Sequence, residues 1–284
     1  TGRVTPSGLE SYLQCAFQFF GSRTLRLKTA PKRPEQRLNE NYLLQGEIVH
    51  NVLAAAYAEP DRIEQVFEEE FERVRAEQRI PKGYHTERLR NAMREDLLAF
   101  AADAKWPRAQ FQSRTEEKFV FALDPSLDVS GRIDRLDVGA DGKSYVIDYK
   151  YSAAQRTKSR LKDGNLLQAP LYYMAAKQHF GVEPDGVFYV GLKGLDPKKG
   201  VDYVGWSHSG FRESNLIPED WLEKARARTL QAALEIRGGR VEVAPANPAN
   251  CRFCDCRDIC RVTTRITTPV MAIVTTDSVG TEGS

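Results

Sequence analysis

The chain has 284 residues, of which 41% are hydrophobic and 28% are charged, which is ordinary globular composition. Its net charge of +2 is too small to indicate a nucleic-acid-binding protein by itself, so any basic surface must be local. The sequence has neither a run of about 18 apolar residues nor a signal-peptide pattern at its start. We therefore expect a cytoplasmic protein that does not bind a membrane.

The first 110 residues are predicted to be mainly helical. Ser7 and Glu10 have the spacing of a capping box, and apolar residues follow at helical spacing, which predicts a first helix. His50 lies in a second predicted helix, in the pattern Gly46-x-x-x-His50-x-x-Leu53. By itself, a lone histidine in such a helix is more often a structural residue than a metal ligand. The helices expected after the first are 42–58, 62–78 and 86–103.

Strands alternate with helices in the rest of the chain. Strands are expected at 115–123, within 128–150, at 186–192 and at 201–206, and helices at 166–180 and 218–237. This pattern predicts a mixed α/β (α+β) fold with a central sheet flanked by helices. We expect one domain over residues 1–264: a helical part (1–110), a sheet core (111–215), and a helix with a cysteine segment (216–264). Residues 265–284 read as a polar tail.

The stretch 128–150 reads as a hairpin whose turn decides which side chains share a face. In a strand, Asp148 and Lys150 point to the same side. A three-residue loop ending at Gly142 would pair Gly139 with Lys143 and set Asp134 opposite Asp148. A two-residue loop would put Asp134 on the other face, because a slip of one residue reverses every side chain.

Two facing carboxylates repel each other unless a positive charge lies between them. Hard oxygen ligands suit Mg²⁺ or Mn²⁺, and Lys150 could reach a water or phosphate at such an ion. The alternative is an Asp148–Lys150 ion pair at the edge of a sheet, since Asp-x-Lys is a weak signal by itself. Basic residues of the segment that follows could bind phosphates; they are Arg156, Lys158, Arg160 and Lys162.

Four of the five cysteines lie within residues 251–260, which suggests a metal site. Four thiolates can bind zinc or a [4Fe–4S] cluster. Cys15, far from the others in sequence, is by itself most simply a buried small hydrophobe.

Several of these patterns, taken in order, resemble the PD-(D/E)XK nuclease superfamily, and more closely its RecB/AddB-type domains and the CRISPR-associated RecB-like exonucleases. Gly131-Arg132-Ile133-Asp134-Arg135 and Ile147-Asp148-Tyr149-Lys150 resemble the central motifs. Gly46-x-x-x-His50 resembles the motif I helix, and Gln168-x-x-x-Tyr172 the motif after Asp-x-Lys. Residues 7–20 resemble the opening helix of the family, and the split cysteines resemble the iron–sulfur pattern of AddB-type members.

The resemblance implies a restriction-endonuclease-like fold and a role for each matching residue. His50, Asp134, Asp148 and the Tyr149 carbonyl would bind Mg²⁺ or Mn²⁺, and Lys150 would be the catalytic lysine. Gln168 and Tyr172 would contact the nucleic acid or brace the site, with simple helix packing as the alternative. A [4Fe–4S] cluster would be bound by Cys15, Cys251, Cys254 and Cys260, with structural zinc as the alternative. Cys256 is an extra thiol, which leaves open which three of the clustered cysteines bind.

The function that the resemblance implies is metal-dependent cleavage of DNA, by an exonuclease or an end-processing nuclease. A helicase or a larger repair, recombination or CRISPR adaptation complex would be its partner. One alternative is a catalytically silent DNA-binding module, which the presence of all four residues His50, Asp134, Asp148 and Lys150 disfavours. Another is a structural zinc protein without nuclease activity.

Overall fold

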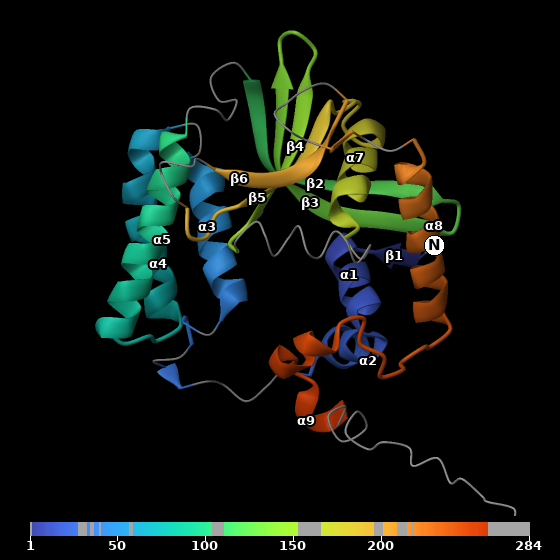
Figure 1. Cartoon of the computed structure of the whole chain (residues 1–284), viewed down its shortest axis with the longest axis horizontal. Coiled ribbons are helices and arrows are strands. Elements are labelled where there is room, and N and C mark those ends of the chain that lie inside the picture. Colours follow the sequence, from blue (N-terminus) through green and yellow to red (C-terminus); the bar gives the residue numbers. More distant parts are fainter. Residues whose placement is uncertain are drawn as a thin grey trace, which may run out of the picture.

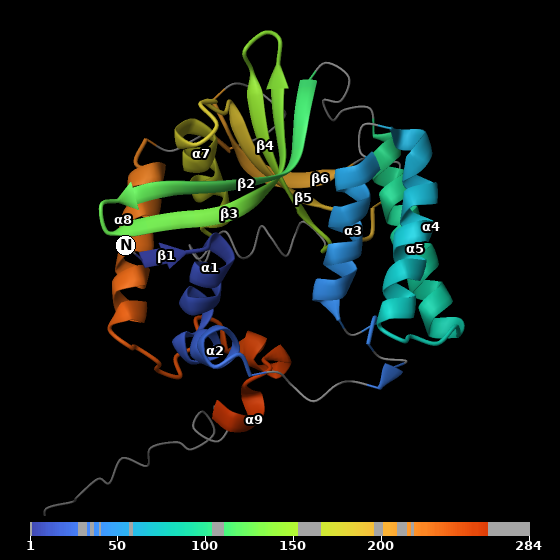
Figure 2. The ribbon, with the colours of Figure 1, turned by 180° about the vertical axis from the view of Figure 1, so that it is seen from behind.

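The computed structural model places a mixed β-sheet between two groups of helices (Figure 1). Helices α3, α4 and α5 lie on one side of the molecule and α1, α7 and α8 on the other, as the reverse view also shows (Figure 2). This arrangement confirms the predicted mixed α/β class. The structure describes residues 2–27, 33–34, 37–39, 41–56, 59–103, 111–152, 166–195, 201–208, 215–216 and 219–260.

The described strands form one sheet in the order β1-β3-β4-β5-β6-β7, with β2 also paired to β3. β2–β3, β3–β4 and β5–β6 are antiparallel, whereas β1–β3, β4–β5 and β6–β7 are parallel. The parallel pair β4–β5 is connected through helix α7. The strands are β1 (Gly2–Val4), β2 (Phe111–Asp124), β3 (Leu127–Gly139), β4 (Ser144–Lys150), β5 (Gly186–Gly191), β6 (Asp202–Ser207) and β7 (Asn215–Leu216).

The predicted helices exist with bounds shifted by a few residues. The longer ones are α1 (Pro6–Gln14), α3 (Tyr42–Ala56), α4 (Ile63–Glu77), α5 (Tyr84–Ala102), α7 (Gln168–Gln178) and α8 (Trp221–Arg237). Short helices α2 (Ala16–Phe19) and α9 (Arg257–Cys260) lie close together in both views (Figures 1 and 2). Among the described residues, no helix is both long and apolar enough to cross a membrane.

Each face of the sheet is covered by its own hydrophobic core. In β4, Val146 is buried in the core shared with α1, α7 and α8, and Ile147 in the core shared with α3, α4 and α5. Tyr149 belongs to the second core, where its ring meets Phe100 of α5 edge-on. Because side chains alternate along a strand, Asp148 and Lys150 lie on the α7 side of β4.

The β3–β4 hairpin has the predicted register. Arg135 pairs with Ile147 and Val138 with Ser144, so the same register sets Asp134 opposite Asp148. The loop closes through a hydrogen bond from the Gly139 amide to the Lys143 carbonyl, at 2.7 Å. Gly142 has φ +83°, the left-handed conformation that a three-residue hairpin loop requires.

The capping box predicted for the first helix is wrong. Thr5 is the N-cap of α1 and accepts a hydrogen bond from the Gly8 amide, at 3.1 Å, and Pro6 begins the helix. Glu10 instead is buried and faces another helix. One of its oxygens accepts hydrogen bonds from the amides of Leu167 and Gln168, at 2.9 and 3.0 Å, at the start of α7. Since those amides have no partner within α7, Glu10 caps that helix.

Candidate active site

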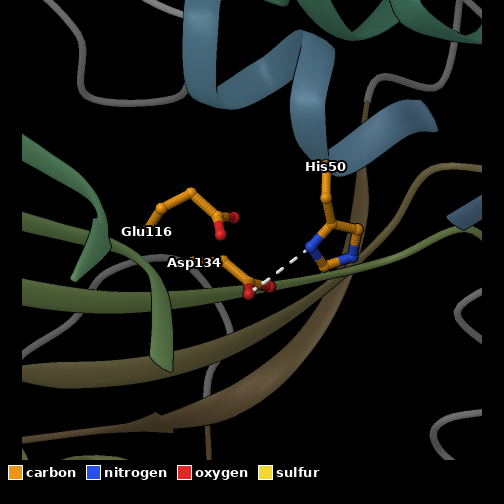
Figure 3. Close-up of side chains that lie close together, drawn as sticks. All are labelled: His50, Glu116 and Asp134. Carbon is orange, nitrogen blue, oxygen red and sulfur yellow. Dashed lines mark ion pairs between the residues drawn. The ribbon is translucent and has the colours of Figure 1, made fainter. Parts of the chain in front are cut away.

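His50 and Asp134 meet where α3 crosses the end of the β3–β4 ladder (Figure 3). His50 Nδ1 lies 3.4 Å from Asp134 Oδ1, and its Nε2 lies 3.0 Å from the Tyr149 carbonyl oxygen. The other Asp134 oxygen accepts a hydrogen bond from the Tyr149 amide, at 2.8 Å. Burial lowers the pKa of His50, but Asp134 outweighs it and the pKa ends above its ordinary value. The pKa of Asp134 is correspondingly lowered by His50 and Lys150, against the effect of burial.

Glu116 completes a group of three possible metal ligands that the sequence did not reveal. One ligand atom each of His50, Glu116 and Asp134 lies within 4.8 Å of the others, and the three side chains converge in Figure 3. The β2–β3 pairs Thr115–Arg135 and Glu117–Ile133 set Glu116 opposite Asp134.

The backbone at Glu116 is strained. Its φ of +57° is unusual for a residue other than glycine and costs about 1–3 kcal/mol. Burial raises the pKa of its carboxyl, which opposes the effect of Arg132, whose Nε lies 2.6 Å away. Strain of this kind persists only where the surrounding structure holds it, and it is common at functional sites. On this strained backbone, the Glu116 carboxylate lies beside His50 and Asp134.

The buried Asp148 and the half-buried Lys150 form an ion pair beside this group. Lys150 Nζ lies 2.5 Å from Asp148 Oδ2, and Asp148 is 2% exposed. Burial raises the pKa of Asp148 to about 7, although Lys150 opposes the shift. Burial also lowers the pKa of Lys150, but Asp148 and Asp134 together leave it raised. Asp148 is not among the three side chains whose ligand atoms lie within 4.8 Å of one another, and one of its oxygens contacts Lys150.

Gln168 and Tyr172 line the other side of Lys150. The Lys150 ammonium donates to Gln168 Oε1 at 2.7 Å, and the Gln168 amide nitrogen donates to the Tyr172 hydroxyl at 3.2 Å. Tyr172 is buried, and burial together with Asp148 and Asp134 raises its pKa well above the ordinary value. Lys150 thus lies between Gln168 and Asp148, and Gln168 in turn contacts Tyr172 one turn along α7.

A buried ion pair supports the end of β4 from the opposite face. Arg135 and Asp137 are fully buried, and the guanidinium donates two hydrogen bonds to the carboxylate at 2.7 and 2.6 Å. Arg135 also donates to the Tyr149 hydroxyl at 3.2 Å. Arg135 therefore fixes the hydroxyl of Tyr149, while the backbone of Tyr149 contacts His50 and Asp134.

The segment around Cys15 contacts the segment that precedes the four clustered cysteines. The Ala246 amide donates to Gln14 O at 2.9 Å and the Phe17 amide to Glu242 O at 3.2 Å, so both flanks of Cys15 contact the C-terminal segment. Burial raises the pKa of Cys251, and the nearby thiols of Cys15 and Cys260 raise it further. The pKa of Cys254 is raised to about 11 by burial, with added effects of Cys256, Cys260 and Cys15.

Cys256 is the most buried of the five thiols, at 3% exposure. A Cβ atom at Gly21 would lie 2.6 Å from its sulfur, so only glycine lets the sulfur approach this closely. The other predicted site residues, Arg156, Lys158, Arg160 and Lys162, lie outside the described residues, as does the tail 265–284.

Comparison with known proteins identifies the family. The family model described as the PD-(D/E)XK nuclease superfamily matches residues 3–261. No curated protein matches the chain. The crystal structure of SSO0001 is similar over 92% of this chain and 86% of that chain, with 12% identity and a TM-score of 0.44, which is too weak to support an argument about the site. Because the family model spans nearly the whole chain, the chain belongs to the PD-(D/E)XK nuclease superfamily.

Proposed function

We propose that the chain is a metal-dependent DNA nuclease that hydrolyses phosphodiester bonds. The observation that carries the proposal is the convergence of His50, Glu116 and Asp134 beside the ion pair of Asp148 and Lys150. Carboxylate oxygens and one imidazole nitrogen are a donor set for a hard divalent cation, and the imidazole favours Mn²⁺ over Mg²⁺.

The residues proposed to hold the cation are His50, Glu116, Asp134 and Asp148, with the Tyr149 carbonyl. When bound, Mg²⁺ or Mn²⁺ would lower the pKa of a coordinated water and polarise a phosphoryl oxygen. Asp134 keeps its position through the Tyr149 amide, and His50 through the Tyr149 carbonyl. The protein thereby fixes the ligands before a metal arrives, which reduces the cost of ordering them.

Lys150 is the proposed catalytic lysine. Its raised pKa keeps the ammonium charged at neutral pH, and Gln168 and Asp148 hold it in one position. A charged ammonium fixed beside the metal ligands can donate to the attacking water or to a phosphate oxygen that gains charge in the transition state. Gln168 and Tyr172 act as positioning residues for it.

We further propose a [4Fe–4S] cluster bound by Cys15, Cys251, Cys254 and Cys260. The effects of the Cys15 and Cys260 thiols on the pKa values of Cys251 and Cys254, and the backbone contacts on both sides of Cys15, support a shared ligand set. Its role would be to fasten the N-terminal helices to the C-terminal segment. Protein purified without oxygen should absorb near about 400 nm, whereas zinc, the alternative, is d¹⁰ and colourless.

The DNA substrate, the preference for ends and a helicase or a larger repair, recombination or CRISPR adaptation complex as partner rest on the resemblance to RecB/AddB-type domains. The test is cleavage of end-labelled single- and double-stranded DNA in Mn²⁺ by wild-type protein and by Asp148→Ala. We expect wild-type protein to release labelled products and Asp148→Ala to release none. Asp141→Ala, in the exposed hairpin loop, is the control and should cleave like wild type. A wild-type protein that binds DNA without cleaving it would instead favour a silent DNA-binding module.

A further inference from the structure

Lys193, just after β5, is held between two tyrosine rings. Its ammonium lies 5.3 Å from the ring centre of Tyr42, at the start of α3, and 5.2 Å from that of Tyr151. The same nitrogen lies 3.4 Å from Gln45 Oε1, and Gln45 is itself buried and donates to the Leu38 carbonyl. Contacts of a cation with ring faces at these distances are attractive, so they hold the Lys193 side chain in this position.

The loop that carries Lys193 is anchored by a buried carboxylate. Asp96 of α5 is 7% exposed and accepts hydrogen bonds from the amides of Gly194 and Leu195, at 2.8 and 3.1 Å. Its other oxygen accepts from the Tyr151 hydroxyl, at 3.0 Å. One carboxylate therefore fixes both the loop and one of the two rings that flank the lysine.

The Tyr42 ring and the Lys193 ammonium can both contact a ligand. The Tyr42 side chain is 58% exposed, although tyrosine is a large aromatic residue. Among the described residues, no carboxylate forms an ion pair with Lys193 within 4 Å, although Asp96 is near enough for the lysine charge to oppose the burial that raises the pKa of Asp96. An exposed ring beside a fixed cation that forms no direct ion pair matches a nucleotide, which offers a base to stack and a phosphate to pair.

The arrangement lies next to the candidate active site. Gly191 pairs with Lys150 in the parallel β4–β5 ladder, and the Leu192 amide donates to the Lys150 carbonyl at 3.0 Å. Tyr42 is eight residues before His50 on α3, a distance of about 12 Å along the helix axis. A strand that reaches the metal ligands could therefore extend to Tyr42.

We propose that Tyr42 and Lys193 form a subsite for one unpaired nucleotide of the strand being cleaved, with the base on the Tyr42 ring and a phosphate on Lys193. The proposal rests on the nuclease function proposed above and names a part of its substrate site. In an intact duplex the bases are stacked and paired, so the subsite selects single-stranded DNA or a frayed end.

The test measures binding of a fluorescein-labelled oligothymidine to the full chain by anisotropy, without added metal. We expect Tyr42→Ala to weaken binding about tenfold, because loss of base stacking on an aromatic ring has about that effect. Tyr42→Phe keeps the ring and should bind like wild type. Lys193→Gln should reduce the slope of log affinity against log salt by about 0.7, as expected for one phosphate contact on a single strand.

Matched controls are available on other surfaces. Tyr84 begins α5 as Tyr42 begins α3 and is 74% exposed, so Tyr84→Ala should leave affinity unchanged. Lys224→Gln, on α8, should leave the salt slope unchanged. Wild-type cleavage is measured in parallel. If wild type cleaves DNA but Tyr42→Ala and Lys193→Gln bind like their controls, the subsite is refuted and the nuclease function stands. If wild type neither binds nor cleaves, both are refuted.

Discussion

The carboxylate of Asp134 accepts a hydrogen bond from the backbone amide of Tyr149, at 2.8 Å. The paired residues of β3 and β4 end at Arg135 and Ile147. Past that pair, the side chain of Asp134 joins the two strands. One candidate metal ligand is thereby tied to the backbone between Asp148 and Lys150. The same carboxylate faces His50, so a single side chain links α3, β3 and β4.

Asp134 therefore has two roles that substitutions can separate. Asp134→Asn keeps an oxygen for the Tyr149 amide but loses the charge that pairs with His50, so we expect weak metal binding and a smaller loss of unfolding free energy than in Asp134→Ala. Asp134→Ala also leaves a buried amide without a partner, which costs about 1–3 kcal/mol. Urea unfolding and Mn²⁺ titration of both variants test this. Equal stability losses in the two variants would contradict the structural role of the hydrogen bond.

Glu116 is expected to contribute to metal affinity. Glu116→Gln removes a charge from the group of three and should raise the Mn²⁺ concentration for half-maximal cleavage by about tenfold, the effect of about 1.4 kcal/mol of binding free energy. Glu117→Gln, one residue along β2, is the matched control and should leave that concentration unchanged. The idea fails if the two variants give the same metal dependence.

Metal binding should depend on pH through Asp148 and His50. Burial gives Asp148 a pKa of about 7 in the metal-free protein, and Asp134 raises the pKa of His50 above its ordinary value. A carboxyl must lose its proton to bind a cation, so Mn²⁺ affinity should fall as the pH drops below about 7. Calorimetric titrations at pH 8 and pH 6 should show proton release on binding that is greater at pH 6. An affinity that does not change between these pH values would argue against Asp148 as a ligand.

Glu10 is expected to support the site from a distance. Glu10→Ala leaves two amides at the start of α7 without their cap, which should lower the free energy of unfolding by about 1–2 kcal/mol. Because α7 carries Gln168, the same variant should also cleave DNA more slowly. Glu10→Gln keeps an accepting oxygen and should lose less stability in urea unfolding. A Glu10→Ala protein as stable as wild type would show that the cap contributes nothing.

The β3–β4 hairpin was predictable because its register depends on a short local loop. Gly142 indicates a three-residue loop, and the loop length alone sets Asp134 opposite Asp148. The helical spacing of apolar residues is also a local signal. It predicted the ends of α3, α7 and α8 to within a few residues.

Glu116 could not be predicted because its position depends on an irregularity in β2. Asp124 pairs with Leu127, and a regular ladder from that pair would set Glu117 opposite Asp134. The register shifts by one between Ala122 and Asp124, and this shift brings Glu116 opposite Asp134 instead. The role of Glu10 was hidden for a similar reason, since its partners at 167–168 are more than 150 residues away in the sequence.

The central claim is that His50, Glu116 and Asp134 hold a divalent cation. The most direct measurement is an anomalous difference map from crystals of the protein soaked in Mn²⁺. We predict a peak within coordination distance of His50 Nδ1 and of carboxylate oxygens of Glu116 and Asp134, and no such peak in crystals of Asp134→Asn. A soaked wild-type crystal that diffracts well and shows no peak between these side chains would contradict the claim.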